Sequence, residues 1–420
     1  MQKIIKFGWL LSFLAVCAIS CGSKTQKLND LIITNASRGK ITSKVSCISN
    51  KSVSYELFLP TAYDSTKIWP VIFCFDSHGD GRMPANLFSE QADQYGYILI
   101  CSDDSKNGQS QDVNLGFYDD MLKDVRNRLK IDEKRIYTSG FSGGSRVASS
   151  VALYRGGVKG VIGCSAGFAT VTKEAQTNFE YLGVVGNEDF NLLEMRQLMK
   201  GLEGSPIPHL LLVFKGTHAW PPKSMVPALF SWLEIKAMHS GLIKINQLTV
   251  QQFAKSCLDS VAKYKTGYDL YNAWYYSTVA SDILKGFPEG EQFNSIVLEM
   301  EKSKELKAIF NKNEKTDIKE QQLQQEYLKY LQEKPADWWR IEVSKIQNMG
   351  KVKNVNSEAA MYKRILSYLS LAAYMNSTNA LKSANYEAAD RFITLYSIID
   401  PENPEHKKLR DELTVKKGQY

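Results

Sequence analysis

Cysteine is scarce in this chain, with seven in 420 residues. Two of them lie within the first 21 residues, and the other five are widely spaced: Cys47, Cys74, Cys101, Cys164 and Cys257. An odd and sparse set of this kind excludes the dense disulfide framework of small secreted domains. Cys74 and Cys101 fall in strands that we expect to be neighbours, so a bridge stays open, but buried free thiols are favoured.

The chain also lacks any block of positive charge. Its formal net charge is +7, but the 52 Lys and Arg residues are spread along the sequence. No predicted helix or strand collects them, so we expect no nucleic-acid partner. With 44% hydrophobic and 23% charged residues, the composition is that of a globular protein. A chain of 420 residues is too long for one ordinary core and predicts two domains.

The first residues have the pattern of an export signal. Lys3 and Lys6 precede an apolar run over residues 7–19. This run has the length of a signal peptide and is short for a transmembrane helix. We therefore expect residues 1–20 to be a signal peptide and residues 21–40 to be a polar tether.

The end of this segment, Ala18-Ile19-Ser20-Cys21, resembles the cleavage site of bacterial lipoproteins. The resemblance implies that Cys21 is lipidated and that the exported protein is anchored to a membrane of the bacterial cell envelope, at the outer membrane or the periplasmic face. Cys17 is a weaker candidate for lipidation, and plain secretion is the alternative.

Strand-like and helix-like runs alternate between residues 41 and 238. Residues 70–75 and 97–101 are continuous apolar runs, typical of buried parallel strands. Residues 223–238 have the pattern of a helix. The alternation predicts an α/β domain over residues 41–238, with a mostly parallel central sheet and right-handed crossovers.

Long helical runs replace the strands in the last part of the chain, and we expect an all-α domain over residues 246–420. Residues 385–392, followed by the helix-stopping Pro401, resemble the second helix and exit turn of a tetratricopeptide repeat. We place this repeat-like region near residues 358–406. An irregular helical bundle without repeats is the alternative.

Residues 140–144 read Gly-Phe-Ser-Gly-Gly, between a strand-like run and a helix-like run. A G-x-S-x-G sequence between a strand and a helix is the nucleophile-elbow pattern, in which a tight turn exposes the serine hydroxyl. The pattern predicts that Ser142 is a nucleophile. The alternative is a serine that only fills a tight turn.

An acid and a histidine follow Ser142 in the order of a catalytic triad. Asp189 comes after the strand-like run 182–185, and His218 comes after the run 210–214. Because all three positions follow strands, parallel pairing brings them to one edge of the sheet. We expect His218 to be the general base and Asp189 the acid that orients it. Glu188 is an alternative acid, Asp189 has the alternative role of a helix cap, and His218 that of a surface-loop residue.

A second loop predicts the oxyanion hole. Residues 75–81 read Phe-Asp-Ser-His-Gly-Asp-Gly after a buried strand. Backbone N–H groups in such a loop, together with the N–H of Gly143, stabilise the negative oxygen of a tetrahedral intermediate. We favour the N–H of Asp80, with Gly79 second, and expect His78 to order the loop beside the substrate. A metal-binding loop through Asp76, His78 and Asp80 is the alternative, but nothing nearby completes a ligand set.

These motifs together resemble the α/β-hydrolase superfamily over residues 50–238. The resemblance is closest to the extracellular esterases grouped with polyhydroxybutyrate depolymerases, feruloyl esterases and dienelactone-hydrolase-like proteins. It is carried by four segments: residues 55–60, His78 with Gly79, residues 140–144, and His218 with Trp220 and Pro221. It implies that Trp220 lines the substrate pocket, and a tryptophan that is simply packed in the core is the alternative. The His-Gly-Asp-Gly loop, the short stretch 164–181 and the long helical C-terminal region depart from the group.

The sequence therefore predicts an envelope-anchored serine hydrolase that cleaves a carboxylic ester without a metal or organic cofactor. Acylated polysaccharide, lipid and peptide all remain open as substrates. A serine peptidase on the same fold is one alternative, and a non-catalytic interaction lipoprotein is another. For the C-terminal helices, docking a protein partner and covering the site are both open.

Overall fold

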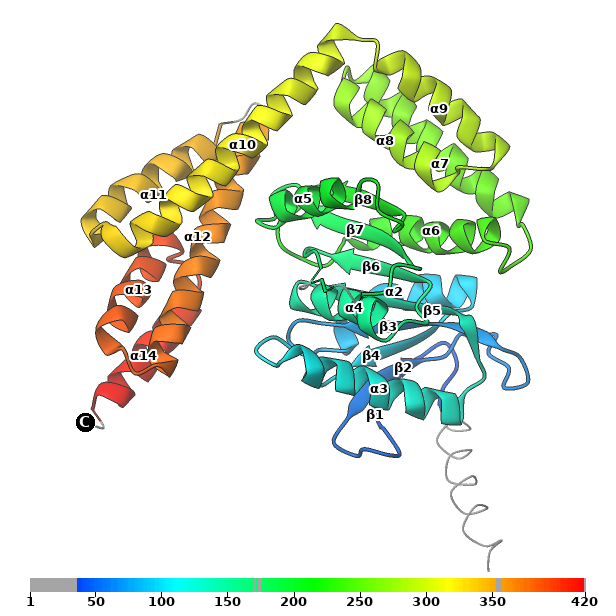
Figure 1. Cartoon of the computed structure of the whole chain (residues 1–420), viewed down its shortest axis with the longest axis horizontal. Coiled ribbons are helices and arrows are strands. Elements are labelled where there is room, and N and C mark those ends of the chain that lie inside the picture. Colours follow the sequence, from blue (N-terminus) through cyan, green and yellow to red (C-terminus); the bar gives the residue numbers. More distant parts are fainter. Residues whose placement is uncertain (1–35, 169–170, 173–174, 353–356, 419–420) are drawn as a thin grey trace, which may run out of the picture.

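The computed structural model describes residues 36–168, 171–172, 175–352 and 357–418 (Figure 1). The predicted signal peptide, Cys21 and most of the predicted tether lie outside these residues. None of the described helices combines the length and the apolar character that a membrane crossing requires.

The centre of the described chain is a sheet of eight strands in the order β1-β2-β4-β3-β5-β6-β7-β8. β1 pairs antiparallel with β2 and β2 antiparallel with β4, whereas all later pairs are parallel. The strands are β1 (Ile41–Ser46), β2 (Ser54–Phe58), β3 (Trp69–Phe75), β4 (Ile98–Ser102), β5 (Ile131–Phe141), β6 (Gly160–Cys164), β7 (Glu180–Gly186) and β8 (His209–Phe214). This order is that of the α/β-hydrolase fold, so the predicted fold class is confirmed.

Helices cover both faces of the sheet because the central strands are apolar on both sides. Ile72 and Cys74 of β3 face the core on the side of α2 (Arg82–Tyr95) and α6 (Val226–His239). Phe73 and Phe75 alternate with them and face the opposite core. That second core is closed by α3 (Gln111–Arg128), α4 (Gly143–Tyr154) and α5 (Leu192–Leu202).

The first C-terminal helices extend the core on the α6 side. They are α7 (Gln247–Thr266), α8 (Leu270–Ile283) and α9 (Pro288–Met300), and their buried residues belong to the same hydrophobic cluster as α2 and α6. Tyr275 of α8 also meets the edge strand β8, where its hydroxyl accepts a hydrogen bond from the N–H of Val213 at 2.7 Å. These helices therefore cover an edge that would otherwise expose unpaired backbone groups.

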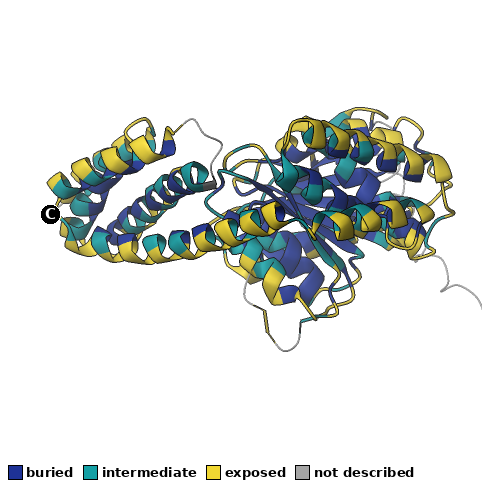
Figure 2. Ribbon diagram, turned by 90° about the horizontal axis from the view of Figure 1, so that it is seen from above, coloured by how far each residue is buried: buried dark blue, intermediate teal, exposed yellow. Residues whose placement is uncertain are grey.

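The remaining helices form a bundle with its own core. α10 (Lys304–Glu333) leads from α9 into α11 (Ala336–Gly350), α12 (Ser357–Lys382), α13 (Tyr386–Ile399) and α14 (Glu405–Lys417). Figure 2 shows that these helices bury their inner faces and expose their outer faces. Ala389 and Phe392 of α13 are buried as the sequence pattern requires, and the helix ends before Pro401. The all-α C-terminal region is confirmed, whereas its repeat character and the domain boundaries stay predictions.

Candidate active site

The turn between β5 and α4 has the strained geometry of a nucleophile elbow. Ser142 has φ 55° and ψ −119°, a conformation that side chains disfavour. A Cβ atom at Gly140 would lie 2.1 Å from the carbonyl oxygen of Gly144, and one at Gly144 would lie 2.0 Å from that of Phe75. The two glycines are therefore required because strand and helix backbones meet at this turn.

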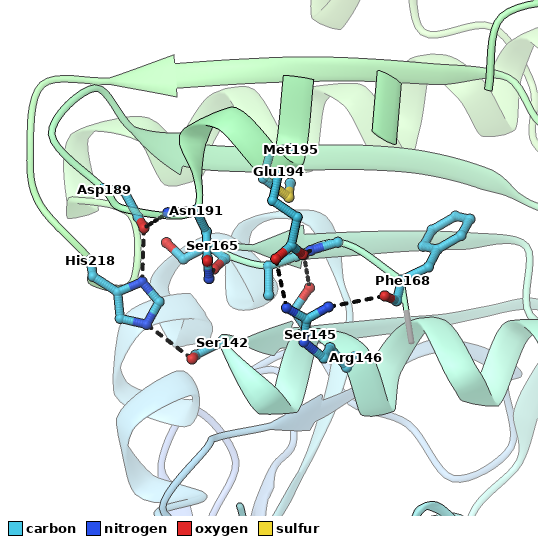
Figure 3. Close-up of polar contacts among 12 residues, drawn as sticks. Ser142, Ser145, Arg146, Ser165, Phe168, Asp189, Asn191, Glu194, Met195 and His218 are labelled. Atoms are coloured by element: carbon cyan, nitrogen blue, oxygen red, sulfur yellow. Dashed lines mark hydrogen bonds and ion pairs between the residues drawn. The ribbon is translucent and has the colours of Figure 1, made fainter. Parts of the chain in front are cut away.

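The structure brings Ser142, His218 and Asp189 into one hydrogen-bonded chain (Figure 3). The His218 Nε2 atom lies 2.9 Å from Ser142 Oγ, and His218 Nδ1 lies 2.9 Å from Asp189 Oδ1. These residues follow β5, β8 and β7, at the carboxyl edge of the sheet where the sequence predicted their convergence. The contact between Ser142 and His218 is within the reach of proton transfer, and the contact between His218 and Asp189 has the length of a charge-assisted hydrogen bond.

Asp189, not Glu188, contacts the histidine. The Asp189 side chain is fully buried, and its Oδ1 also accepts the N–H of Asn191 at 2.8 Å. Its Oδ2 has no hydrogen-bond partner among the residues that the structure describes. Glu188 points elsewhere and pairs with Lys363 of α12 at 2.7 Å. A buried carboxylate held against one imidazole nitrogen is suited to fix the tautomer and orientation of that ring.

Two phenylalanines that the sequence analysis did not single out hold the His218 ring. Phe190 stacks on the imidazole with ring centroids 4.2 Å apart, and Phe141 lies 4.8 Å away at a tilted angle. The histidine side chain is 22% exposed. Both phenylalanines adjoin a predicted triad residue in the sequence, which is the only signal that could have drawn attention to them.

The loop after β3 is held by the carboxylate of Asp76. Asp76 Oδ1 accepts the backbone N–H of His78 at 2.8 Å, and Oδ2 accepts the buried indole N–H of Trp220 at 2.8 Å. The structure thus places Trp220 within the core, as a donor to this loop. This placement agrees with the alternative of a packed tryptophan, and the pocket-lining role stays a prediction. The His78 side chain is 80% exposed, with its ring 3.2 Å from Ser77 Oγ.

The expected oxyanion donors differ in their surroundings. The N–H of Gly79 donates to the carbonyl of Asp76 at 3.2 Å, which closes a turn. Asp80 is exposed at the end of this turn, just before α2. Gly143, the third expected donor, opens α4 directly after Ser142. The N–H of Gly79 is therefore already engaged, which favours Asp80 over Gly79 on this loop.

The loop after β4, which contains Asp103 and Asn107, packs against both segments that carry the expected oxyanion donors. The backbone N–H of Asn107 donates to the carbonyl of Ser77 at 2.8 Å. Its side-chain Oδ1 would lie 1.7 Å from a Cβ atom at Gly143, so the amide covers this glycine directly. A Cβ atom at Gly79 would lie 2.9 Å from the carbonyl oxygen of Asp103 in the same loop. No pattern in the sequence marks Asn107 as a residue of the site.

An ion pair connects the elbow helix to α5 beside the triad (Figure 3). Arg146, in the first turn of α4, pairs with Glu194 of α5 at 2.8 Å and donates to the carbonyl of Phe168 at 3.0 Å. Glu194 also accepts the N–H of Gly167 at 2.8 Å. These contacts fix the segment that follows β6 next to the helix that starts at the nucleophile turn.

No protein-family model and no curated protein matches the chain. Among solved structures, the chain is similar to the S-formylglutathione hydrolase FrmB of Staphylococcus aureus, with 13% identity over 46% of this chain and 96% of that one and a TM-score of 0.39. A ferulic acid esterase matches with 14% identity over 46% of this chain and 96% of that one, with a TM-score of 0.38. Dipeptidyl peptidase 4 of Porphyromonas gingivalis matches with 14% identity over 46% of this chain and 34% of that one, with a TM-score of 0.37. The assignment to the α/β-hydrolase fold follows from the strand order described above.

Proposed function

We propose that this protein is a serine hydrolase that cleaves a carboxylic ester through an acyl-enzyme intermediate. The observation that carries the proposal is the chain of hydrogen bonds from Ser142 through His218 to the buried Asp189. The contact between Ser142 and His218 has the length that proton transfer requires, Asp189 holds the other nitrogen of the ring, and the serine occupies a strained turn that projects its hydroxyl.

In the first half of the proposed reaction, Ser142 Oγ attacks the ester carbonyl while His218 Nε2 takes the hydroxyl proton. The carbonyl oxygen becomes an oxyanion. It accepts hydrogen bonds from the backbone N–H of Gly143 and from the backbone N–H of Asp80 in the loop after β3. Asp189 stabilises the imidazolium that has formed. The tetrahedral intermediate collapses, the alcohol leaves with the proton from His218, and the acyl group remains on Ser142.

In the second half, a water molecule replaces the alcohol. His218 removes a proton from the water as it attacks the acyl-enzyme, and the same backbone donors hold the second oxyanion. When this intermediate collapses, His218 returns the proton to Ser142 and the carboxylic acid is released. The residues of this chain are sufficient for every step, so the proposal needs no metal or organic cofactor.

The test is hydrolysis of p-nitrophenyl acetate together with labelling by a fluorophosphonate. Wild-type protein should do both, and Ser142→Ala should abolish labelling and lower the turnover rate by about 10⁴-fold or more. Ser89→Ala is the matched control, because Ser89 is a partly exposed serine on α2 outside the site. Turnover that survives Ser142→Ala would rule out the proposed nucleophile.

Ester cleavage is distinguished from amide cleavage by substrate panels, since the triad chemistry serves both. The ester panel should include acetylated xylan, methyl ferulate and short-chain esters, and a peptide panel should be run beside it. We expect turnover of the esters and none of the peptides. Faster turnover of peptides would make the protein a serine peptidase, and inactivity on all substrates without labelling would favour an interaction protein.

The N-terminal segment indicates where in the cell the proposed enzyme acts. We infer that Cys21 is lipidated and that the enzyme acts at a membrane surface of the cell envelope, where the C-terminal helices remain able to meet a protein partner. In cells fed a clickable palmitate analogue, the wild-type chain should become labelled and Cys21→Ala should not. Cys17→Ala is the control and should keep the label, whereas a labelled Cys21→Ala chain would exclude this anchor.

A further inference from the structure

Among the residues that the structure describes, three basic side chains make polar contacts between the C-terminal bundle and the domain that carries the triad. Two of them come from α12 and reach residues 187–191, the loop between β7 and α5 that carries Asp189 and is named here the acid loop. Lys363 pairs with Glu188 at 2.7 Å, and Arg364 donates to the carbonyl oxygen of Asn187 at 2.8 Å. The bundle therefore lies beside the edge of the sheet that carries the proposed triad (Figure 1).

The third contact is separate from the acid loop. Arg196 of α5 pairs with Asp317 of α10 at 2.6 Å, with both side chains partly exposed. It joins the same two parts of the molecule, but it connects helix α5 to helix α10 and does not involve the acid loop. This pair therefore offers a control for the docking of the bundle without any contact to the acid loop.

Arg364 is the contact with the most defined geometry. The residue is 3% exposed and its partner Glu320 of α10 is fully buried. The guanidinium meets both carboxylate oxygens of Glu320, with Nε 2.9 Å from Oε1 and Nη2 on Oε2. This two-point pairing fixes the plane of the guanidinium and aims the remaining Nη1 at Asn187. A buried ion pair adds little net stability compared with apolar residues of similar size, so stability alone does not explain it.

Asn187 in turn ties the acid loop to the loop that carries His218. Its backbone N–H donates to the carbonyl of Phe214 at 2.8 Å, and its side-chain Oδ1 accepts the N–H of Gly216 at 3.0 Å. The N–H of Glu188 donates to the carbonyl of Gly216 at 2.8 Å. A movement of Asn187 would therefore shift both the acid and the base of the triad.

We propose that Arg364 is a positioning residue for the reaction, which holds the acid loop and through it the Asp189–His218 pair in register with Ser142. This inference rests on the proposed hydrolase function. It assigns to the C-terminal bundle a part in assembling the site, through a backbone carbonyl that lies two residues from the acid. A misplacement of about 1 Å is enough to slow catalysis by about 100-fold.

The experiment compares Arg364→Met with the double variant Arg364→Met plus Glu320→Leu. The single variant leaves the Glu320 carboxylate buried without its partner, so both its thermal midpoint and its kcat should fall. The double variant removes that unpaired charge and should regain most of the thermal midpoint. Because neither variant can reach Asn187, kcat should stay about 10–100-fold low in both, with KM within about threefold of wild type.

Arg196→Ala is the matched control, and its kcat should stay within about twofold of wild type. If kcat returns to the wild-type value together with the thermal midpoint in the double variant, Arg364 serves only the stability of the bundle and the proposal is wrong. The proposal is also wrong if Arg196→Ala lowers kcat as much as Arg364→Met.

Amide hydrogen exchange separates this inference from the proposed function. Exchange in residues 186–190 and 214–218 should be faster in both Arg364 variants and unchanged in Arg196→Ala. If the wild-type protein hydrolyses no ester, the proposed function fails, but the exchange rates still decide whether Arg364 holds the acid loop. Unchanged exchange in these two segments would overturn the positioning role whatever the activity.

Discussion

Trp220 donates its indole N–H to Asp76 across 2.8 Å in the protein interior. This bond connects the loop that carries His218 to the loop after β3, in which the proposed oxyanion donor lies. The other oxygen of Asp76 accepts the N–H of His78, so one carboxylate holds both sides of the proposed site. A displacement of either loop should therefore also move the other, and with it the proposed base and the proposed oxyanion donor.

Trp220→Phe keeps the aromatic packing and removes this donor. Because Asp76 is then left buried with one oxygen unpaired, we expect the free energy of unfolding to fall by about 1–3 kcal/mol. We also expect kcat for an ester to fall about tenfold, since the oxyanion donor loses its alignment. Urea unfolding and steady-state kinetics measure the two effects.

Trp274→Phe is the matched control for this prediction. Its indole also donates to a carboxylate, that of Glu301 at 3.0 Å, but on an exposed part of the surface. Water replaces the lost partner there, so stability should change by less than about 1 kcal/mol and kcat not at all. Equal effects of the two substitutions would contradict a special role for the Trp220–Asp76 bond.

Asp189→Asn tests the identity of the triad acid. The amide fills the same space but no longer stabilises a protonated His218, and it favours the wrong tautomer of the ring. We expect kcat to fall by about 10⁴-fold with little change in the fold, as judged by circular dichroism. Glu188→Gln should stay within about threefold of wild type, because it weakens only a partly exposed pair with Lys363. A larger loss in Glu188→Gln than in Asp189→Asn would reverse the assignment.

The sequence was sufficient to predict that the three proposed triad residues come together in space. Ser142, Asp189 and His218 each follow a recognisable apolar strand, and parallel strands bring their carboxyl ends to one edge. The place of each residue directly after a parallel strand was therefore enough to predict that all three lie at the same edge of the sheet. The alternation of strand-like and helix-like runs was likewise sufficient to predict the α/β fold class.

Contacts between distant segments left no such pattern. Arg364 lies 177 residues from Asn187, and the contact ends on a backbone carbonyl, which any residue type offers. Asn107 meets Gly143 through a loop with no periodicity, and Trp220 matched a pocket residue as well as a core residue. These positions depend on how preformed elements pack, and a single sequence does not encode that packing in any local signal.

Asp103 should give the protein a pH-dependent stability. Burial, and then the nearby Glu56 carboxylate, raise the pKa of Asp103 to about 6 from an ordinary value of 3.8. Between about pH 4 and pH 6 the folded state thus binds more protons than the unfolded chain. The free energy of unfolding therefore falls as the pH rises through this window, and the penalty is complete above it.

Asp103→Asn removes this charge from the fold. The difference in the free energy of unfolding between the variant and wild type should rise in favour of the variant by about 2 kcal/mol from pH 4 to pH 8, as measured by urea unfolding. Asp119→Asn is the control, because Asp119 forms an exposed pair with Arg155 and should give a difference below about 1 kcal/mol. A difference between Asp103→Asn and wild type that stays constant with pH would contradict the buried-charge argument.

Gly144→Ala should disable the proposed nucleophile turn. The added Cβ would lie 2.0 Å from the carbonyl oxygen of Phe75, and neither backbone moves without shifting β3 or α4. We expect a loss of about 2 kcal/mol or more in stability and a fall in kcat, because Ser142 moves with α4. Gly201→Ala is the control: Gly201 lies in α5 with open space around its Cα, and alanine there should stabilise the helix by about 0.5–1 kcal/mol. Thermal unfolding and fluorophosphonate labelling measure both variants, and a Gly144→Ala protein that labels Ser142 at the wild-type rate would show that the close approach of these backbones is not needed for the site.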